Sequence, residues 1–140
     1  MLIIHSDSIK VETQGFTDSH DITPDLEQSL KESRIREGLL TVMVSGSTAA
    51  VTTIENEPGA IADLKQALDR IAPLDIEYAH NIRWNDGNGF AHVRAALMKP
   101  ALSIPVIGGR MSIGTWQQVV FLDFDNRPRS RSLVVQIIGM

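Results

Sequence analysis

The chain has 140 residues, of which 43% are hydrophobic and 21% charged, so it holds enough apolar material for one domain with its own core. Thirteen lysines and arginines against 17 acids give a formal net charge of −4, which argues against a basic surface that binds nucleic acid. There is no cysteine, and this excludes disulfides, thiolate nucleophiles and cysteine-type zinc sites.

The apolar stretches are strand-sized, far short of the roughly 20 residues that a membrane-spanning helix needs. The N-terminus lacks the basic and long apolar regions of a signal peptide, so we expect a soluble, cytoplasmic protein. No repeat, low-complexity tract or linker divides the sequence. We therefore predict a single domain over residues 1–140.

The N-terminal elements begin with a period-two alternation over residues 8–13, which predicts a half-buried strand. Residues 17–22 are expected to form a loop. A helix is expected to start at Thr23, because threonine is a good N-cap and the proline that follows suits the first helical position. We predict that this helix runs to about Glu37 and that Gly38 ends it.

The middle of the chain predicts two strands and the clearest helix. Residues 39–45 and 48–54 are rich in β-branched residues and are separated by a Gly-Ser pair. Over residues 59–72, apolar side chains recur at the spacing of one helix face. Of the acids that precede this helix, Glu57 is expected to complement the helix dipole, and Glu55 is the better functional candidate.

The C-terminal part predicts a long polar loop over residues 78–90, a short helix and three strands. The helix and strands are expected at 91–98, 101–107, 117–124 and 133–138. The turns between the strands are too short for crossovers, so the strands should be antiparallel. About seven strands and three helices without regular alternation indicate an α+β fold.

The polar loop contains the strongest candidates for chemistry. His80, Asp86 and His92 offer two imidazoles and a carboxylate, which suit a divalent metal such as Zn²⁺ or Mn²⁺. The alternative is a plain turn, with the histidines solvated or capping. The Asp-Gly-Asn-Gly sequence before the short helix can also form a nest of backbone amides for a phosphate.

Arginines in two further segments are candidate contacts to an anionic ligand. Arg110 lies in a glycine-rich stretch between strands, so it can face a phosphate, or the stretch can be an ordinary connection whose Trp116 packs on the core. Arg131 belongs to three arginines around the last turn. These form either a solvated rim or a site that collects an anionic ligand.

Three segments of the chain resemble the signature stretches of the YjbQ-like family, whose members are often labelled secondary thiamine-phosphate synthases. They are Ser45–Glu57 (SGSTAAVTTIENE), Asp86–His92 (DGNGFAH) and Gly109–Gln117 (GRMSIGTWQ). The order and gaps agree as well, and the third stretch is the most specific. The resemblance covers about residue 38 to the C-terminus and is weaker before that.

The resemblance implies an α+β fold with an antiparallel, sandwich-like β-rich core, assembled as a homotrimer. It also implies a polar pocket in which His80, Asp86 and His92 act as catalytic residues and as ligands of a divalent metal (Mg²⁺, Mn²⁺ or Zn²⁺). The same resemblance implies contacts to a small phosphorylated ligand from further residues. These are Glu55, Asn88, Arg110, Thr115, Gln117 and Arg131.

The activity that the resemblance implies is a transferase reaction that joins a pyrimidine pyrophosphate to a thiazole phosphate and releases pyrophosphate. The alternative is a non-catalytic homotrimer that binds a metal or a phosphorylated ligand. One departure favours the alternative: Gly46 stands where many relatives have a histidine, so one potential ligand or proton carrier is missing.

Overall fold

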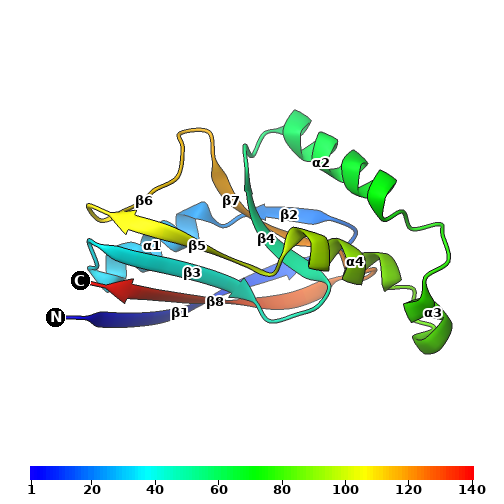
Figure 1. Ribbon diagram of the computed structural model, residues 1–140, viewed down its shortest axis with the longest axis horizontal. Coiled ribbons are helices and arrows are strands. Elements are labelled where there is room, and N and C mark those ends of the chain that lie inside the picture. Colours follow the sequence, from blue (N-terminus) through cyan, green and yellow to red (C-terminus); the bar gives the residue numbers. More distant parts are fainter.

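A computed structural model describes all residues from 1 to 140 and contains eight strands and four helices (Figure 1). In chain order these are β1 Ile3–Thr13, β2 Asp18–Asp21, α1 Thr23–Ser33, β3 Gly38–Val44, β4 Ala49–Ile54, α2 Pro58–Ile71, α3 Ala79–Trp84, α4 Gly89–Met98, β5 Ala101–Ile107, β6 Arg110–Met111, β7 Gln118–Asp123 and β8 Arg129–Gly139. No helix among them is long and apolar enough to cross a membrane.

The strands form two antiparallel sheets that curl into a half-barrel. The larger sheet has the order β1-β8-β3-β5-β6 and the smaller one β2-β7-β4. Every paired neighbour runs antiparallel. The predicted α+β class with an antiparallel β-rich core is therefore confirmed, although with one helix and one strand more than expected.

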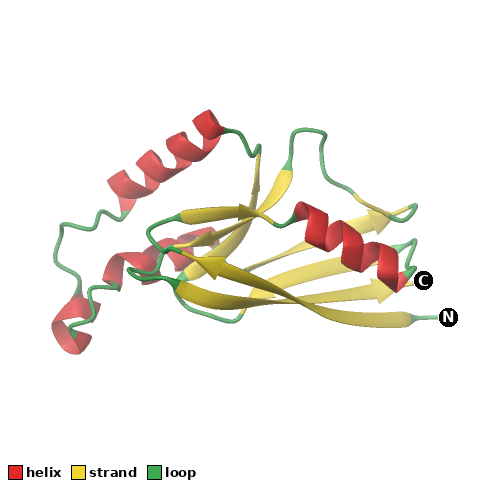
Figure 2. Cartoon of the chain, turned by 180° about the vertical axis from the view of Figure 1, so that it is seen from behind, coloured by secondary structure: helices red, strands yellow, loops and turns green.

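Strand β7 separates two cores because both of its faces are buried. Val119 and Phe121 belong to the larger core, which lies between the two sheets and α1. Val120 and Leu122 alternate with them and pack in a smaller core under α4. A continuous apolar strand of this kind is expected where helices cover one face of a sheet and a second sheet covers the other. Figure 2 shows α1 and α4 on opposite sides of the sheets.

Helix α1 ends at Ser33, four residues before the predicted end. Arg34 takes a left-handed conformation with φ of 60° and stops the helix. The backbone N–H groups of Arg36 and Glu37 then donate to the carbonyl of Met140. Gly38 opens β3 instead of capping the helix, and a Cβ there would collide with the backbone of β8. Pairing with the C-terminus therefore overrides the local helix signal.

Two segments that were expected to be loops contain regular structure. Residues 18–21 form β2, which pairs with β7. The two strands are far apart in the sequence, so no local pattern indicates their pairing. The predicted loop at 78–90 contains α3, and α4 begins at Gly89. A Cβ at Gly89 would collide with the Tyr78 side chain, so the glycine permits the close packing of the first turn of α4.

Strands β7 and β8 follow each other through a short turn but do not pair. Strand β7 pairs with β2 and β4, whereas β8 lies between β1 and β3. The intervening turn therefore carries the chain from one sheet to the other. This crossing places the acids that end β7 next to the arginines that begin β8.

Candidate functional site

The first candidate site is the histidine cluster, made of His80 from α3, Asp86 from the following turn and His92 from the first turns of α4. His80 Nε2 lies 3.0 Å from Asp86 Oδ2. The rings of His80 and His92 have centroids 4.3 Å apart. One ligand atom from each of the three residues lies within 4.8 Å of the other two. The structure thus brings together the three residues that the sequence analysis named as metal ligands.

The tight turn between α3 and α4 explains why these residues meet. Asn85 and Gly87 both have positive φ, 53° and 70°, which lets the chain reverse in a few residues. Asp86 Oδ1 accepts a hydrogen bond from the Asn88 N–H at 3.1 Å. The Asn81 side chain accepts one from the Gly89 N–H at 2.8 Å. These bonds fix the entry to α4 and hence the position of His92.

The electrostatics of the histidine cluster favour an ionised carboxylate. The hydrogen bond from His80 lowers the pKa of Asp86 below its ordinary value, and the Asn88 amide lowers it further. The cluster is partly open, with the side chains of His80 and Asp86 31% and 42% exposed. Two imidazoles and one carboxylate form a donor set that suits Zn²⁺ or Mn²⁺, and an open side leaves coordination positions for water or a ligand.

A polar network continues from the histidine cluster toward the turn between β7 and β8. Asn88, which is buried, accepts a hydrogen bond from the Asn126 N–H at 2.9 Å. The Asn126 side chain donates to the Asp86 carbonyl at 2.7 Å. The neighbouring Asp125 accepts from Thr48 and forms an ion pair with Arg129 at 3.1 Å. The turn that joins the two sheets is thereby tied to the histidine cluster.

Arg131 lies at the far side of this network and is held by acids. Its Nε and one terminal nitrogen donate to the two oxygens of the fully buried Asp123 at 2.7 and 2.9 Å. The same terminal nitrogen donates to Thr48 at 2.6 Å. The hydrogen bond to Asp123 raises the pKa of Arg131 above its ordinary value. Only Nη1 has no partner, and a Cβ at Gly46 would lie 2.9 Å from it.

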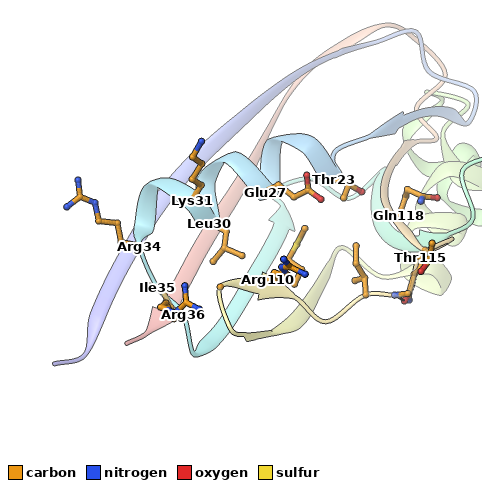
Figure 3. Close-up of a pocket in the computed structure, with 15 residues that line it drawn as sticks. Thr23, Glu27, Leu30, Lys31, Arg34, Ile35, Arg36, Arg110, Thr115 and Gln118 are labelled. Atoms are coloured by element: carbon orange, nitrogen blue, oxygen red, sulfur yellow. Dashed lines mark hydrogen bonds between the residues drawn. The ribbon is translucent and has the colours of Figure 1, made fainter.

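The second candidate site is the cationic cavity, a hollow of about 770 Å³ between α1 and the segment that runs from β6 to β7 (Figure 3). Arg110, Thr115 and Gln117 line it, so three of the predicted ligand-binding residues meet here. The cavity is lined by Thr23, Glu27, Leu30, Lys31, Arg34, Ile35, Arg36, Gly109, Arg110, Met111, Ile113, Gly114, Thr115, Gln117 and Gln118.

The predicted site residues therefore divide into two groups within one chain. The histidine cluster with Asn88 and Arg131 is one group, and Arg110 with Thr115 and Gln117 is the other. Figure 1 shows α3 and β6 at opposite ends of the long axis. Glu55 belongs to neither group: it is exposed just past β4, and its side chain has no hydrogen bond or ion pair. Glu57 caps α2 by accepting from Gly59 and Ala60, as expected.

Sequence reasoning missed several polar residues of these regions. Lys31, Arg34 and Arg36 line the cationic cavity, and the signal in the sequence was three bases within six residues at the end of a predicted helix. Arg94 is buried and donates to the Ala72 carbonyl, to Thr17 and to Asp69, which ties α4 to α2. Nothing in the helical pattern of residues 91–98 marked this role.

His5 also lies near two acids. One side-chain ligand atom from each of His5, Asp7 and Glu32 lies within 4.8 Å of the other two. The His5 imidazole makes no hydrogen bond or ion pair, and its Nε2 is buried without a partner. The two acids are exposed, so this cluster differs from the histidine cluster, where a direct hydrogen bond already orients one imidazole.

The protein is thus a small α+β half-barrel with a histidine-carboxylate cluster at one end and a cationic cavity at the other. The family model described as "UPF0047 protein YjbQ-like" matches residues 7–140. The chain therefore belongs to the YjbQ-like, UPF0047 family, and the resemblance predicted from the three sequence stretches is confirmed.

Relatives and solved structures support this family over nearly the whole chain. A UPF0047 protein of Methanothermobacter thermautotrophicus is 34% identical over 136 residues, which cover 97% of this chain and 93% of the relative. A YbjQ-like protein of unknown function from Sulfolobus solfataricus has a TM-score of 0.94 at 27% identity, with 100% of both chains covered. A hypothetical protein from Aeropyrum pernix has a TM-score of 0.89 at 31% identity, with 96% of this chain and 98% of that chain covered.

Proposed function

We propose that this protein binds a divalent metal at the histidine cluster and acts there on a small phosphorylated ligand. The observation that carries the proposal is the convergence of His80, Asp86 and His92, whose ligand atoms lie within 4.8 Å. Three protein ligands with one open side are typical of catalytic rather than structural metal sites. The ionised state of Asp86 supports the same reading, because a cation needs the carboxylate in that form.

The particular reaction that we propose is of the thiamine-phosphate synthase type, in which a pyrimidine pyrophosphate and a thiazole phosphate are joined and pyrophosphate leaves. A divalent metal would supply charge neutralisation for the pyrophosphate. His80, oriented by its hydrogen bond to Asp86, would hold one ligand nitrogen toward the metal. His92 approaches from α4 and would either complete the site or protonate the leaving group.

A non-catalytic role in binding is the second candidate, and the surroundings of Gly46 favour it. The family resemblance implies a histidine at this position, whereas here the space above the glycine borders the Arg131 guanidinium. Arg131 is engaged by Asp123 and Thr48, and only one of its nitrogens is free to meet a ligand. A protein of this kind would retain the metal and the ligand and lack turnover.

The test is a turnover assay with both phosphorylated substrates and Mg²⁺, Mn²⁺ or Zn²⁺, run on the native chain and on Asp86→Ala and His92→Ala. We expect thiamine phosphate from the native chain and a loss of about 100-fold or more in either variant, with the fold intact by circular dichroism. A matched control is His20→Ala: His20 Nε2 lies 2.9 Å from Asp18 Oδ2, much as His80 lies from Asp86, but no third ligand is near.

Each outcome of this assay separates the two candidates. Metal binding by calorimetry that disappears in His92→Ala, together with no product, would leave the binding role and remove the synthase reaction. An unchanged metal affinity in both Asp86→Ala and His92→Ala would contradict the metal site itself.

The proposal includes a homotrimer, and one face of the larger sheet supports self-association. The outward face carries three cross-strand rows without any charged residue, and most of these side chains are exposed. The rows are Ile4–Ile138–Leu39–Pro105, Ser6–Gln136–Thr41–Ser103 and Ser8–Val134–Met43–Ala101. In a chain with 21% charged residues, such a face is typical of an interface.

Light scattering after size exclusion tests the assembly. We expect a trimeric mass for the native chain and a monomeric mass for Val134→Lys, because a charge would be buried without a partner. Ser130→Lys, at an exposed position of the same strand beyond the three rows, is the control and should remain trimeric. A monomeric native chain would contradict the proposed assembly.

A further inference from the structure

The cationic cavity gathers positive charge in a protein whose net charge is negative. Four of its lining residues are basic, Lys31, Arg34, Arg36 and Arg110, whereas Glu27 is the only acid among them. The whole chain has 13 basic and 17 acidic residues. None of the four basic side chains forms an ion pair within the chain. Their charge is therefore available to a ligand.

The helix dipole accounts for part of this arrangement only. Lys31 and Arg34 lie in and just past the last turn of α1, where cations interact favourably with the carbonyl end of a helix. Arg36 and Arg110 lie outside the helix. Arg36 is held by a hydrogen bond of 3.3 Å from its Nη2 to the Gly108 carbonyl. Figure 3 shows Arg110 in the space between α1 and the β6 segment, while Arg34 points outward. Arg36 and Arg110 are therefore the pair that needs an explanation.

The other lining residues of the cavity indicate which further chemical groups a ligand would contact. Leu30, Ile35 and Met111 are buried and form an apolar floor. Thr115 and Gln118 lie at the opposite end from Arg36 and offer a hydroxyl and an amide (Figure 3). A volume of about 770 Å³ is in the range of small-molecule sites. The cavity thus combines a cationic end, an apolar floor and a neutral hydrogen-bonding end.

We propose that the cationic cavity is a binding site for a phosphorylated organic compound of about nucleotide size, and that Arg36 and Arg110 hold its phosphates. Arginine is suited to this role because its planar guanidinium donates two parallel hydrogen bonds to a phosphate. The organic part lies on Leu30 and Met111 and reaches Thr115 and Gln118. The site rests on the proposed function for its ligand class, and it needs neither the metal nor the histidine cluster.

The two tryptophans allow binding to be followed at each end separately. Trp116 is 73% exposed and follows Thr115 of the cavity, whereas Trp84 is 63% exposed and ends α3 beside the histidine cluster. The chain has no other tryptophan. Trp84→Phe therefore leaves a single fluorophore, which reports on the cavity.

The experiment titrates the Trp84→Phe protein with ADP and with inorganic pyrophosphate in the presence of EDTA, and calorimetry on the native chain checks the affinity. We expect saturable binding of ADP that is tighter than that of pyrophosphate, because only ADP uses the apolar floor. Arg36→Ala and Arg110→Ala should each weaken binding about tenfold or more, because each removes a charge-assisted contact to a phosphate. Arg70→Ala removes one exposed arginine from α2, far along the chain from the cavity, and should change nothing.

Three outcomes would overturn the site: no saturable binding of either probe, equal weakening by Arg70→Ala and Arg110→Ala, or loss in His92→Ala with no effect of Arg110→Ala. The second outcome would mean nonspecific charge attraction, and the third would place the anion at the histidine cluster. Binding that persists in EDTA while no thiamine phosphate forms would support the site and contradict only the synthase reaction.

Discussion

The two ends of the molecule balance their charges in different ways. At the end with α3 and α4, acids and bases are paired within the chain: His80 with Asp86, Arg129 with Asp125 and Arg131 with Asp123. In the cationic cavity, four basic side chains have no acidic partner. The first arrangement is held by its own hydrogen bonds, whereas the second has charge left over for another molecule.

This difference separates two kinds of candidate residue. Arg131 was predicted as an anion contact because it belongs to an arginine-rich turn, but most of its donors already bind Asp123 and Thr48. Arg110 was predicted because it lies in a glycine-rich stretch between strands, and its side chain forms no ion pair within the chain. A count of basic residues in a sequence does not distinguish the two cases. Only the position of the nearest carboxylate does.

Replacement of Arg131 should have the largest effect, and it tests whether the paired end is mainly structural. Arg131→Met would leave the buried Asp123 without its cation, which costs about 3–5 kcal/mol of unfolding free energy. Urea denaturation measures this loss. Arg127→Met removes an exposed arginine from the same turn and should stay within about 0.5 kcal/mol. Equal stability of the two variants would contradict the structural reading of Arg131.

A smaller, pH-dependent effect is expected from Asp125. Burial raises the pKa of its carboxyl, but hydrogen bonds, first from Arg129, outweigh this, so its pKa lies below the ordinary 3.8. A carboxyl whose pKa is lowered by folding contributes stability that is complete above its unfolded pKa, ordinarily 3.8, and is lost as the pH falls through the folded pKa.

The measurement is urea denaturation of the native chain and of Asp125→Asn, from neutral pH down to about pH 3. The native chain should lose stability more steeply than the variant in the acid range. Asp63→Asn, an exposed acid on α2, should keep the native slope. Parallel curves for all three proteins would contradict a lowered pKa of Asp125 in the folded state.

The smallest effect should come from Gly46. A Cβ at this position would lie 2.9 Å from Arg131 Nη1, the far end of a flexible side chain, so Gly46→Ala should cost about 1 kcal/mol as Arg131 shifts slightly. Gly46→His introduces the histidine that the family resemblance implies at this position, and it tests whether the absence of that histidine removes chemistry or makes room for Arg131. A gain of metal affinity or turnover in Gly46→His would show that the missing histidine removes chemistry from this chain. A loss of stability alone would show that glycine is needed here to leave space for Arg131.

Much of the fold was predictable because its signals are local. The alternation in β1, the helical spacing in α2 and the apolar run of β7 each report burial within a few residues. The end of α1 was missed because residues 36 and 37 bond to the carbonyl of Met140, about a hundred residues away in sequence. Strand β2 was missed for the same reason, since four polar residues become a strand only beside β7.

The family and the residues worth testing could be predicted from the sequence, because three short stretches of residues carry the resemblance. How those residues are grouped depends on the tertiary structure. It brought His80, Asp86 and His92 within reach of one ion, and it placed Arg110 with Arg36 at a cavity at the other end. It also showed that Arg131 is already paired. The reason is physical: the charge that a side chain can offer to a ligand depends on the partners that surround it in three dimensions, and these partners come from distant parts of the chain.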